Sequence, residues 1–394
     1  MMSESKIVMD VLFGSSRSIG DHWRCSNRVI LYRMLEAQSH GRPAKSTTPG
    51  SRRPEERIMR NRLFVLAVAE VSLAISARAE THELKLTPMN VHWGYYDAHL
   101  KPVLKIASGD TVRVETMVAG GLERLNMAGV PDAEIPDSLK QVEKSITDRG
   151  PGAHPLTGPI YVQRAEPGDI LEVHILGFEY LHPFGVTGFR PGSGTLPDEF
   201  PYARFKMIRF DPKAGVAEFS RGVRLKLAPF WGSIGVAPPL VIHRLSSGPP
   251  GSHAGNLDNK ELVAGSILYL PVHVPGALLS IGDGHALQGD GEVTITALET
   301  SLRGTVQIFV RKGRQIRWPR AETPTHFITM GLNPDLNEAA RMATREMIDF
   351  LMSQKGMSRD EAYILCSLAA DLRVTQLVDD TKGIHAMVAK SIFH

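Results

Sequence analysis

Groups that could ligate a metal or move protons are gathered in the stretch IGDGHALQGDGEVTIT, residues 281–296. Asp283, His285, Asp290 and Glu292 supply one imidazole and three carboxylates there. Such groups can bind a divalent metal or share proton transfer during a hydrolysis. The interspersed glycines let the backbone turn tightly enough to aim several of them at one point. Asx turns that bond their own backbone would explain the same composition, so this stretch alone leaves both interpretations open.

A second polar group lies upstream in SHAGNLDNKEL, where His253, Asn256 and Asp258 occupy a glycine-containing loop. A strand is expected to follow over residues 268–274. The two loops can meet in space if the strands beside them are neighbours in a sheet. We therefore expect Asp258 to lie close to His285, although spacing along the chain does not establish that contact.

Short strands must position these groups. Alternating runs at 111–116, 169–175, 292–298 and 305–311 each place every second residue on one face. Gly and Pro number 36 and 26 and cluster between such runs, which favours antiparallel strands over a βαβ array. The sequence therefore predicts a mainly β fold with a β-sandwich-like antiparallel body.

Helices are predicted near the end of the chain. The tripeptide NPD at 333–335 is a helix-start signal, and apolar residues then recur at helical spacing until Gly356. Ser358 and Glu361 form a capping box before a second helix through about Leu372. We expect two or more C-terminal helices that pack against the β body or a partner subunit.

Composition bounds the class of protein. The 394 residues are 42% hydrophobic and 22% charged, which is typical of a soluble globule with a sizeable core. The formal charge is only +3, and the basic residues are dispersed beyond the first sixty positions, so nucleic-acid binding is not expected. Cys25 and Cys366 form neither a disulfide framework nor a zinc-finger spacing.

The first eighty residues differ from the rest. Residues 1–58 lack sustained periodicity and are interpreted as disordered or as translated upstream of the real start. Residues 59–79 have the basic start, apolar run and A-x-A site of a secretory signal peptide, with a short amphipathic helix as the alternative. The apolar run is shorter than the ~20 residues that span a bilayer, so no stable membrane insertion is expected after processing. Use of this signal would make the protein periplasmic or secreted; otherwise it would be cytoplasmic.

A long block of the chain resembles the acetamidase/formamidase family. Its hallmark is similar to HGGNxD…LPVxVxGALxxxGDxHAxQGDGE, and residues 253–300 read HAGNLDNKELVAGSILYLPVHVPGALLSIGDGHALQGDGEVTITALET. The similarity extends through 157–175, 229–238 and 367–387, so residues 80–394 are predicted to form the catalytic domain. Ala254 replaces a family glycine and Leu287 a smaller residue, and either change would alter the pocket.

This resemblance implies hydrolysis of a small linear carboxamide, such as formamide or acetamide, to the acid and ammonia. It also implies a homo-oligomer with metal ions near the His/Asp loops, and it points to Asp258, Asp283 and His285 as metal ligands. Calcium prefers all-oxygen ligation, whereas His285 favours a transition metal such as zinc or acid–base chemistry. The divalent ion therefore stays open between zinc and calcium.

Amide hydrolysis needs an activated water, a stabilised oxyanion and a proton for the leaving nitrogen. The catalytic candidates are Glu292, His285, Asp290 and Asn256. Glu292 would carry the proton, while Asn256 or glycine N–H groups would face the oxyanion. Cys366 lies in a helical apolar run and is interpreted as a core thiol, so attack by water is preferred over a cysteine nucleophile. The alternative function is a secreted β-sandwich module that binds a solute or a cation without catalysis.

Overall fold

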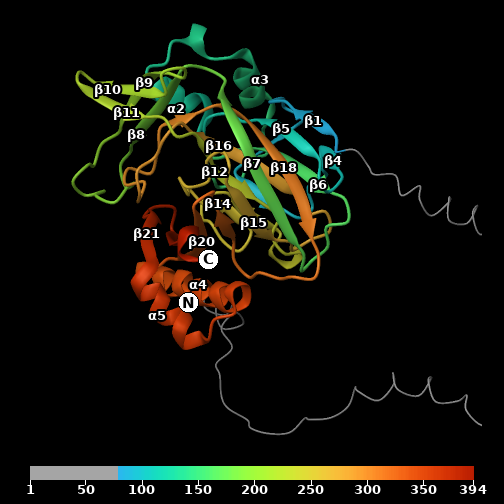
Figure 1. Cartoon of the computed structure of the whole chain (residues 1–394). Coiled ribbons are helices and arrows are strands. Elements are labelled where there is room, and N and C mark those ends of the chain that lie inside the picture. Colours follow the sequence, from blue (N-terminus) through green and yellow to red (C-terminus); the bar gives the residue numbers. More distant parts are fainter. Residues whose placement is uncertain (1–78) are drawn as a thin grey trace, which may run out of the picture. The chain divides into compact units, whose positions relative to one another are not determined.

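Two large β-sheets form the body of the described chain, which comprises residues 79–394 of the computed structural model (Figure 1). The predictions for 1–58 and for 59–79, apart from Ala79, fall outside these residues. The nine-stranded sheet has the order β1 (Thr81–Leu84), β5 (Thr111–Glu115), β18 (Leu302–Arg311), β7 (Ile170–Tyr180), β15 (Ile267–Pro271), β19 (Arg320–Glu322), β20 (His326–Asn333), β22 (Lys382–Ala389), β21 (Ala370–Gln376).

The second large sheet has eleven strands. Its main path is β11 (Val223–Lys226), β10 (Val216–Ser220), β9 (Arg204–Asp211), β8 (Phe184–Phe189), β17 (Glu299–Thr300), β16 (Leu279–His285), β12 (Phe230–Gly235), β14 (Ala254–Asn256). β6 (Pro155–Val162) also pairs with β16 and carries β2 (Val91–Trp93) and β4 (Leu104–Ile106). A small sheet pairs β13 (Arg244–Ser246) with β3 (Tyr95–Asp97).

The described sheets are antiparallel apart from the β1–β5 and β4–β6 pairs. Both large sheets contribute to one hydrophobic core, in which Val112 and Val173 from the first meet Trp231 and Ile281 from the second. Burying side chains of this size stabilises the fold by about 1.5–3 kcal/mol each. The predicted mainly β, β-sandwich-like antiparallel body is thereby confirmed.

The C-terminal helices are α4 (Leu336–Lys355) and α5 (Arg359–Ala369), and α4 packs on β20 and β22 (Figure 1). Gly356 ends α4 in the left-handed conformation, with φ 68°, and Ser358 and Glu361 form the predicted capping box. Two shorter helices, α2 (Gly121–Met127) and α3 (Asp137–Ser145), pack on each other. Single 3₁₀ turns are η2 (Asp132–Glu134), η3 (Leu240–Ile242) and η4 (Lys390–Ile392).

Two predicted boundaries and one predicted strand were wrong. The second C-terminal helix ends at Ala369 rather than near Leu372, because the following residues form β21 and pair with β22. Two strands, β21 and β22, therefore follow the helices. The strand expected over 268–274 is Ile267–Pro271. The alternating run 292–298 is not a strand, because Glu292 and Ile295 have positive φ values of 43° and 72° and break the extended chain.

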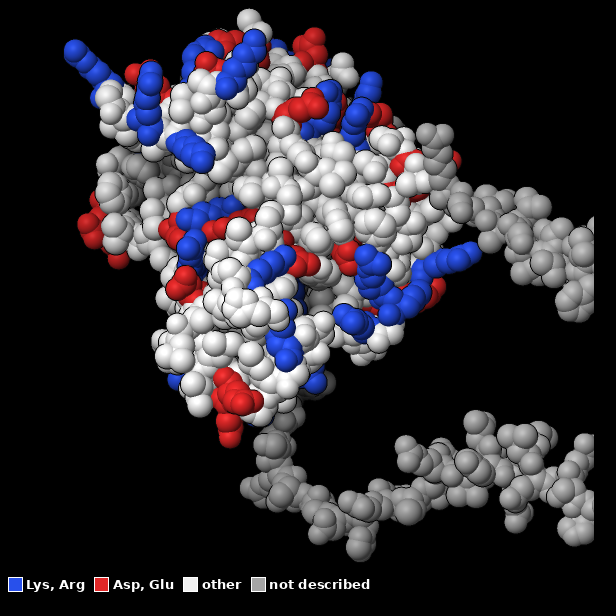
Figure 2. Space-filling view, in the orientation of Figure 1, with Lys and Arg blue, Asp and Glu red and all other residues white. Residues whose placement is uncertain are grey.

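The face in Figure 2 shows Lys and Arg side chains interspersed with Asp and Glu, without a continuous stripe of one sign. This pattern agrees with the near balance of 45 basic and 42 acidic residues in the whole sequence. Among residues 79–394, no helix combines the length and the apolar character that crossing a membrane requires.

Candidate metal and catalytic centre

The candidate centre is formed around Asp258, Asp283 and His285. It lies on one face of the eleven-stranded sheet, where β16 runs between β12 and β17. Asp283 and His285 are two residues apart in β16, and Asp283 departs from extended backbone with φ 57°, so their meeting comes from the folded structure rather than from strand alternation. Asp258 follows β14, and its backbone N–H donates to the carbonyl oxygen of Gly232 in β12 at 3.1 Å. Of the glycine-rich stretch 281–296, residues 281–285 belong to this buried strand, and residues 286–296 form a loop.

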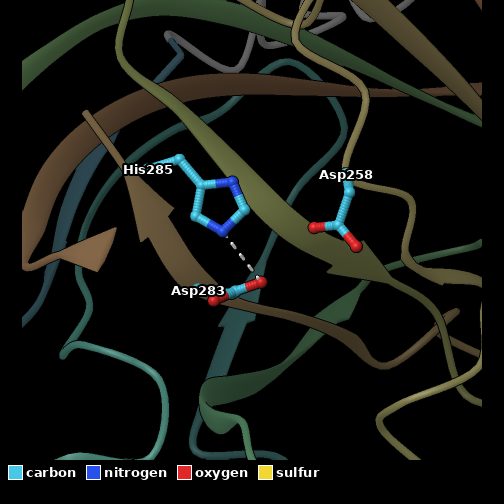
Figure 3. Close-up of side chains that lie close together, drawn as sticks. All are labelled: Asp258, Asp283 and His285. Carbon is cyan, nitrogen blue, oxygen red and sulfur yellow. Dashed lines mark ion pairs between the residues drawn. The ribbon is translucent and has the colours of Figure 1, made fainter. Parts of the chain in front are cut away.

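Asp258, Asp283 and His285 point toward one another (Figure 3). One ligating atom from each lies within 4.8 Å of those from the other two, and all three residues are buried. Nε2 of His285 lies 3.3 Å from Oδ2 of Asp283. The expected meeting of Asp258 with His285 is thus present, while the role of each residue stays a prediction.

Gly232 leaves the space into which these groups point. A Cβ atom at this position would lie 2.5 Å from Oδ1 of Asp258, 2.5 Å from Oδ2 of Asp283 and 2.8 Å from Cε1 of His285. Carbon atoms do not approach polar atoms so closely without a shift. Glycine is therefore required here because any side chain would occupy the centre.

Several buried polar atoms around this space have no hydrogen-bond partner among residues 79–394. They are Oδ1 of Asp258, Oδ1 of Asp283, Nε2 of His285 and Oε2 of Glu299. An unpaired buried polar atom costs about 1–3 kcal/mol, so a cluster of them on converging side chains needs a ligand to explain it. Carboxylate oxygens with one imidazole nitrogen are a donor set for a divalent cation. The residues present therefore fit such an ion.

Gln288 orients the His285 ring. Its side-chain nitrogen donates to the backbone oxygen of Asp258 at 2.8 Å, which leaves its oxygen 3.0 Å from Nδ1 of His285. Nδ1 therefore donates, and Nε2 faces the centre. Such an outer contact fixes the ring orientation that a metal-binding histidine needs.

Four further groups reach the same space. Glu292 and Glu299 each place a carboxylate within 4.8 Å of His285, and Asp379 does so with Asp258 and Glu292. Nε2 of His154 lies 3.7 Å from Oδ2 of Asp283. Sequence reasoning missed Glu299, Asp379 and His154. The pairing of β17 with β16 places Glu299 directly opposite His285, and only the sheet register reveals this contact.

Burial and crowding perturb the acids. Burial raises the pKa of Asp258 well above its usual range, and the charges of Glu292 and Asp379 raise it further. Burial likewise raises the pKa of Glu292 well above its ordinary value. The pKa of Asp379 rises to about 6, chiefly through burial. Like charges in a buried group disfavour one another, so this cluster favours a bound cation or a shared proton.

Asp283 and His285 behave as an ion pair. Burial alone would raise the pKa of Asp283, but the charges of His285 and His154 outweigh it and lower this pKa. Burial would lower the pKa of His285, but Asp283 and Glu299 outweigh it and raise this pKa well above the usual value. Nε2 of His285 therefore carries either a proton or a cation.

Asn256 lies beside the centre with its side chain fully engaged. Its nitrogen donates to Oδ2 of Asp258 at 2.6 Å and to Oδ2 of Asp379 at 3.3 Å. Its oxygen accepts from the Ser233 hydroxyl at 2.8 Å. Asp290 instead lies at the surface, 3.0 Å from Nζ of Lys260, and is not brought into the cluster.

Three other residues considered in the sequence analysis lie outside this cluster. Cys366 is buried in the hydrophobic cluster of the C-terminal helices, in keeping with a packing role. Ala254 is buried in the main core with φ 64°, a conformation that favours glycine. Leu287 packs against the cluster that contains Ile208 and Phe210.

Comparisons with known proteins identify the family of this chain. The model of the Acetamidase/Formamidase family matches residues 83–246 and 243–394. The formamidase of Methylophilus methylotrophus is 32% identical over 249 residues, which cover 50% of this chain and 58% of that protein. The matches to three curated relatives span 58–61% of their lengths.

Solved structures match this chain over a larger share of their own length than the curated relatives do. The acetamidase from Bacillus halodurans has a TM-score of 0.65 and 33% identity, covering 80% of this chain and 98% of that one. The acetamidase from Yersinia enterocolitica has a TM-score of 0.69 and 30% identity, covering 82% and 96%. With a family model matched across nearly all described residues, this chain belongs to the Acetamidase/Formamidase family.

Proposed function

We propose that this protein hydrolyses the C–N bond of a small linear carboxamide to give a carboxylic acid and ammonia. The observation that carries the proposal is the buried meeting of Asp258, Asp283 and His285 around the space beside Gly232. Relatives named formamidase and acetamidase support the substrate class. Formamide and acetamide are therefore the first substrates to test.

A divalent ion is the proposed cofactor, held by Asp258, Asp283 and His285. When bound there, it would supply a Lewis acid that activates water and polarises a carbonyl oxygen. The imidazole nitrogen among the donors favours zinc over calcium, which prefers oxygen ligands alone. Gln288 would assist by holding Nε2 of His285 toward the ion.

Glu292 is the proposed proton carrier. It is buried, it lies within reach of His285, and burial raises its pKa well above its ordinary value, as is typical of carboxyls that exchange protons in active sites. It would take a proton from the attacking water and deliver it to the departing nitrogen. We propose that Asn256 holds Asp258 and Asp379 in place, since its nitrogen donates to both; a donor role toward the oxyanion stays a prediction.

An ammonia-release assay tests this function. The full chain is incubated with formamide, acetamide and longer amides, before and after chelation, and after return of zinc or calcium. We expect release from at least one short amide, loss on chelation and recovery with zinc. No release from any amide, with or without added metal, would contradict hydrolysis and favour the binding-module alternative.

We also propose that the protein forms homo-oligomers through its C-terminal face. Tyr363, Ile364 and Leu368 on α5 and Leu372 on β21 are 50–79% exposed. They line a hollow of about 600 Å³ beside β21, which is the edge strand of its sheet. A second copy is the occupant proposed here, because an apolar edge of this kind can pair with itself about a two-fold axis.

Export to the periplasm or beyond is the proposed localisation, supported by the signal-peptide pattern at 59–79. Expression of the full chain followed by cell fractionation and N-terminal sequencing tests it. A protein that begins near Glu80 in the exported fraction is expected. A cytoplasmic protein that retains residues 59–79 would contradict the proposal.

A further inference from the structure

One buried charged side chain beside the centre has no part in the chemistry above. Arg124 on α2 places Nη1 3.1 Å from Oε1 of Glu299 on β17. The side chains of Arg124 and Glu299 are only 8% and 3% exposed. Burying two charges costs several kcal/mol before their attraction offsets it, so stability alone is a weak reason for such a pair.

The local backbone is shaped to admit the guanidinium. Gly120 precedes α2 with φ 71°, and a Cβ there would lie 2.9 Å from Nε of Arg124. The helix is held from the other side, because Oε2 of Glu143 accepts from the backbone N–H of Leu122 at 3.3 Å. Arg124 is thus presented to Glu299 from a fixed element rather than from a loose loop.

The two oxygens of Glu299 have different neighbours. Oε1 pairs with Arg124, whereas Oε2 lies 3.5 Å from Nε2 of His285 and has no hydrogen bond within the described residues. A buried ion pair to one oxygen restrains the rotation of the carboxylate, because the attraction between the two charges is little screened there. The contact with Arg124 therefore decides where the free oxygen points.

We propose that Arg124 is a positioning residue, which holds Glu299 so that its free oxygen faces Nε2 of His285 and the shared space. This inference rests on the proposed amide hydrolysis. It extends the centre across the sheet to α2, a helix that carries none of the predicted site residues. Outer contacts of this kind typically change metal affinity or activity by about 10–100-fold when they are removed.

The surroundings of Arg124 allow its proposed positioning role to be tested by substitution. Its other side lines a hollow of about 390 Å³ together with Trp93, Arg149 and Arg190. A shorter polar side chain at position 124 can therefore be hydrated from this hollow. A matched control is the pair between Arg320 and Glu346, at 2.7 Å and with side chains 17% and 11% exposed, which lies outside the cluster.

The experiment compares Arg124→Gln, Arg124→Lys and the control Arg320→Gln in the full chain. Ammonia release gives kcat and KM, chelator competition gives zinc affinity without substrate, and thermal melting reports folding. We expect Arg124→Gln to lose about 10–100-fold in kcat or zinc affinity with a smaller change in KM, and Arg124→Lys to lose less. Arg320→Gln should lower the melting temperature while kcat and zinc affinity stay near wild type.

Three outcomes are decisive. Wild-type kcat and zinc affinity in folded Arg124→Gln, or losses no larger than those of Arg320→Gln, would overturn the positioning role. If Arg124→Gln does not fold, Arg124→Lys decides, and wild-type values in that variant would overturn it too. If the wild-type protein releases no ammonia, the proposed function fails on its own, and zinc affinity still tests the positioning of Glu299.

Discussion

Gly232 and the carboxylate of Asp258 lie so close that a Cβ on the glycine would come within 2.5 Å of Oδ1. The same Cβ would lie 2.5 Å from Oδ2 of Asp283, so a single methyl group would displace both acids. We predict that Gly232→Ala lowers turnover and zinc affinity by about 100-fold, because a shift of about 1 Å in a reacting group has that effect. Ammonia release and chelator competition measure the two losses.

Gly289→Ala is the matched control for this prediction. Gly289 lies in the segment that follows β16, and a Cβ there would meet no atom within 4 Å. Turnover and zinc affinity should therefore stay near wild type. Equal effects of the two substitutions would show that the space beside Gly232 has no special role.

Glu292→Gln should remove proton transfer and leave the metal ligands in place. Gln has nearly the same size, so the backbone at φ 43° need not change. We expect kcat to fall by about 10²–10⁴-fold, the usual contribution of a general acid–base group, with zinc content unchanged. Glu346→Gln, at a buried acid outside the cluster, is the control. Full activity in Glu292→Gln would eliminate this residue as the proton carrier.

The sequence predicts the fold where local signals and long-range packing agree. The run at 305–311 lies within β18, where every second residue from Leu302 to Ile308 is buried. The capping box at Ser358 sets the start of α5. The run 292–298 has the same alternation but lies in a loop, because Glu292 turns into the left-handed region. Alternation alone does not report such a backbone turn.

The residues of the centre could be predicted from local sequence only in part. Asp283 and His285 stand two residues apart, so they are close in space even though Asp283, with φ 57°, departs from extended backbone. Asp258 could be proposed from its loop. Glu299 joins them through the register of β17 against β16, and Asp379 comes from the loop that joins β21 to β22. Local sequence does not specify these long-range pairings.

Asp110 gives a prediction on stability and pH. Burial acts to raise its pKa, but hydrogen bonds from Glu80, His82 and Ala107 outweigh burial and hold the pKa below the usual 3.8. A carboxyl with a lowered folded pKa stabilises the fold above its unfolded pKa, and this contribution disappears as the pH falls through the folded value. Asp110→Asn should therefore cost about 1–3 kcal/mol at neutral pH.

The pH dependence separates this effect from a general loss of packing. Denaturant unfolding of wild type and Asp110→Asn should differ at neutral pH and begin to converge below about pH 4, where the unfolded carboxyl takes up a proton while the folded one is still ionised. Asp198→Asn, at an exposed position, should unfold as wild type does throughout. A constant difference between wild type and Asp110→Asn down to low pH would contradict the assignment.

Leu368→Lys tests the proposed contact between copies. Leu368 is 79% exposed near the end of α5, so the change costs little within one chain, and a lysine suits the last turn of a helix. In a two-fold contact, each copy would bring its own lysine to the interface, and desolvating these like charges would oppose association. Light scattering should therefore show a smaller assembly than in wild type, with unchanged melting of the monomer fold.

Leu196→Lys, at a side chain 50% exposed in the loop between β8 and β9, should leave the assembly intact. An unchanged mass for Leu368→Lys would place any contact between copies on another face.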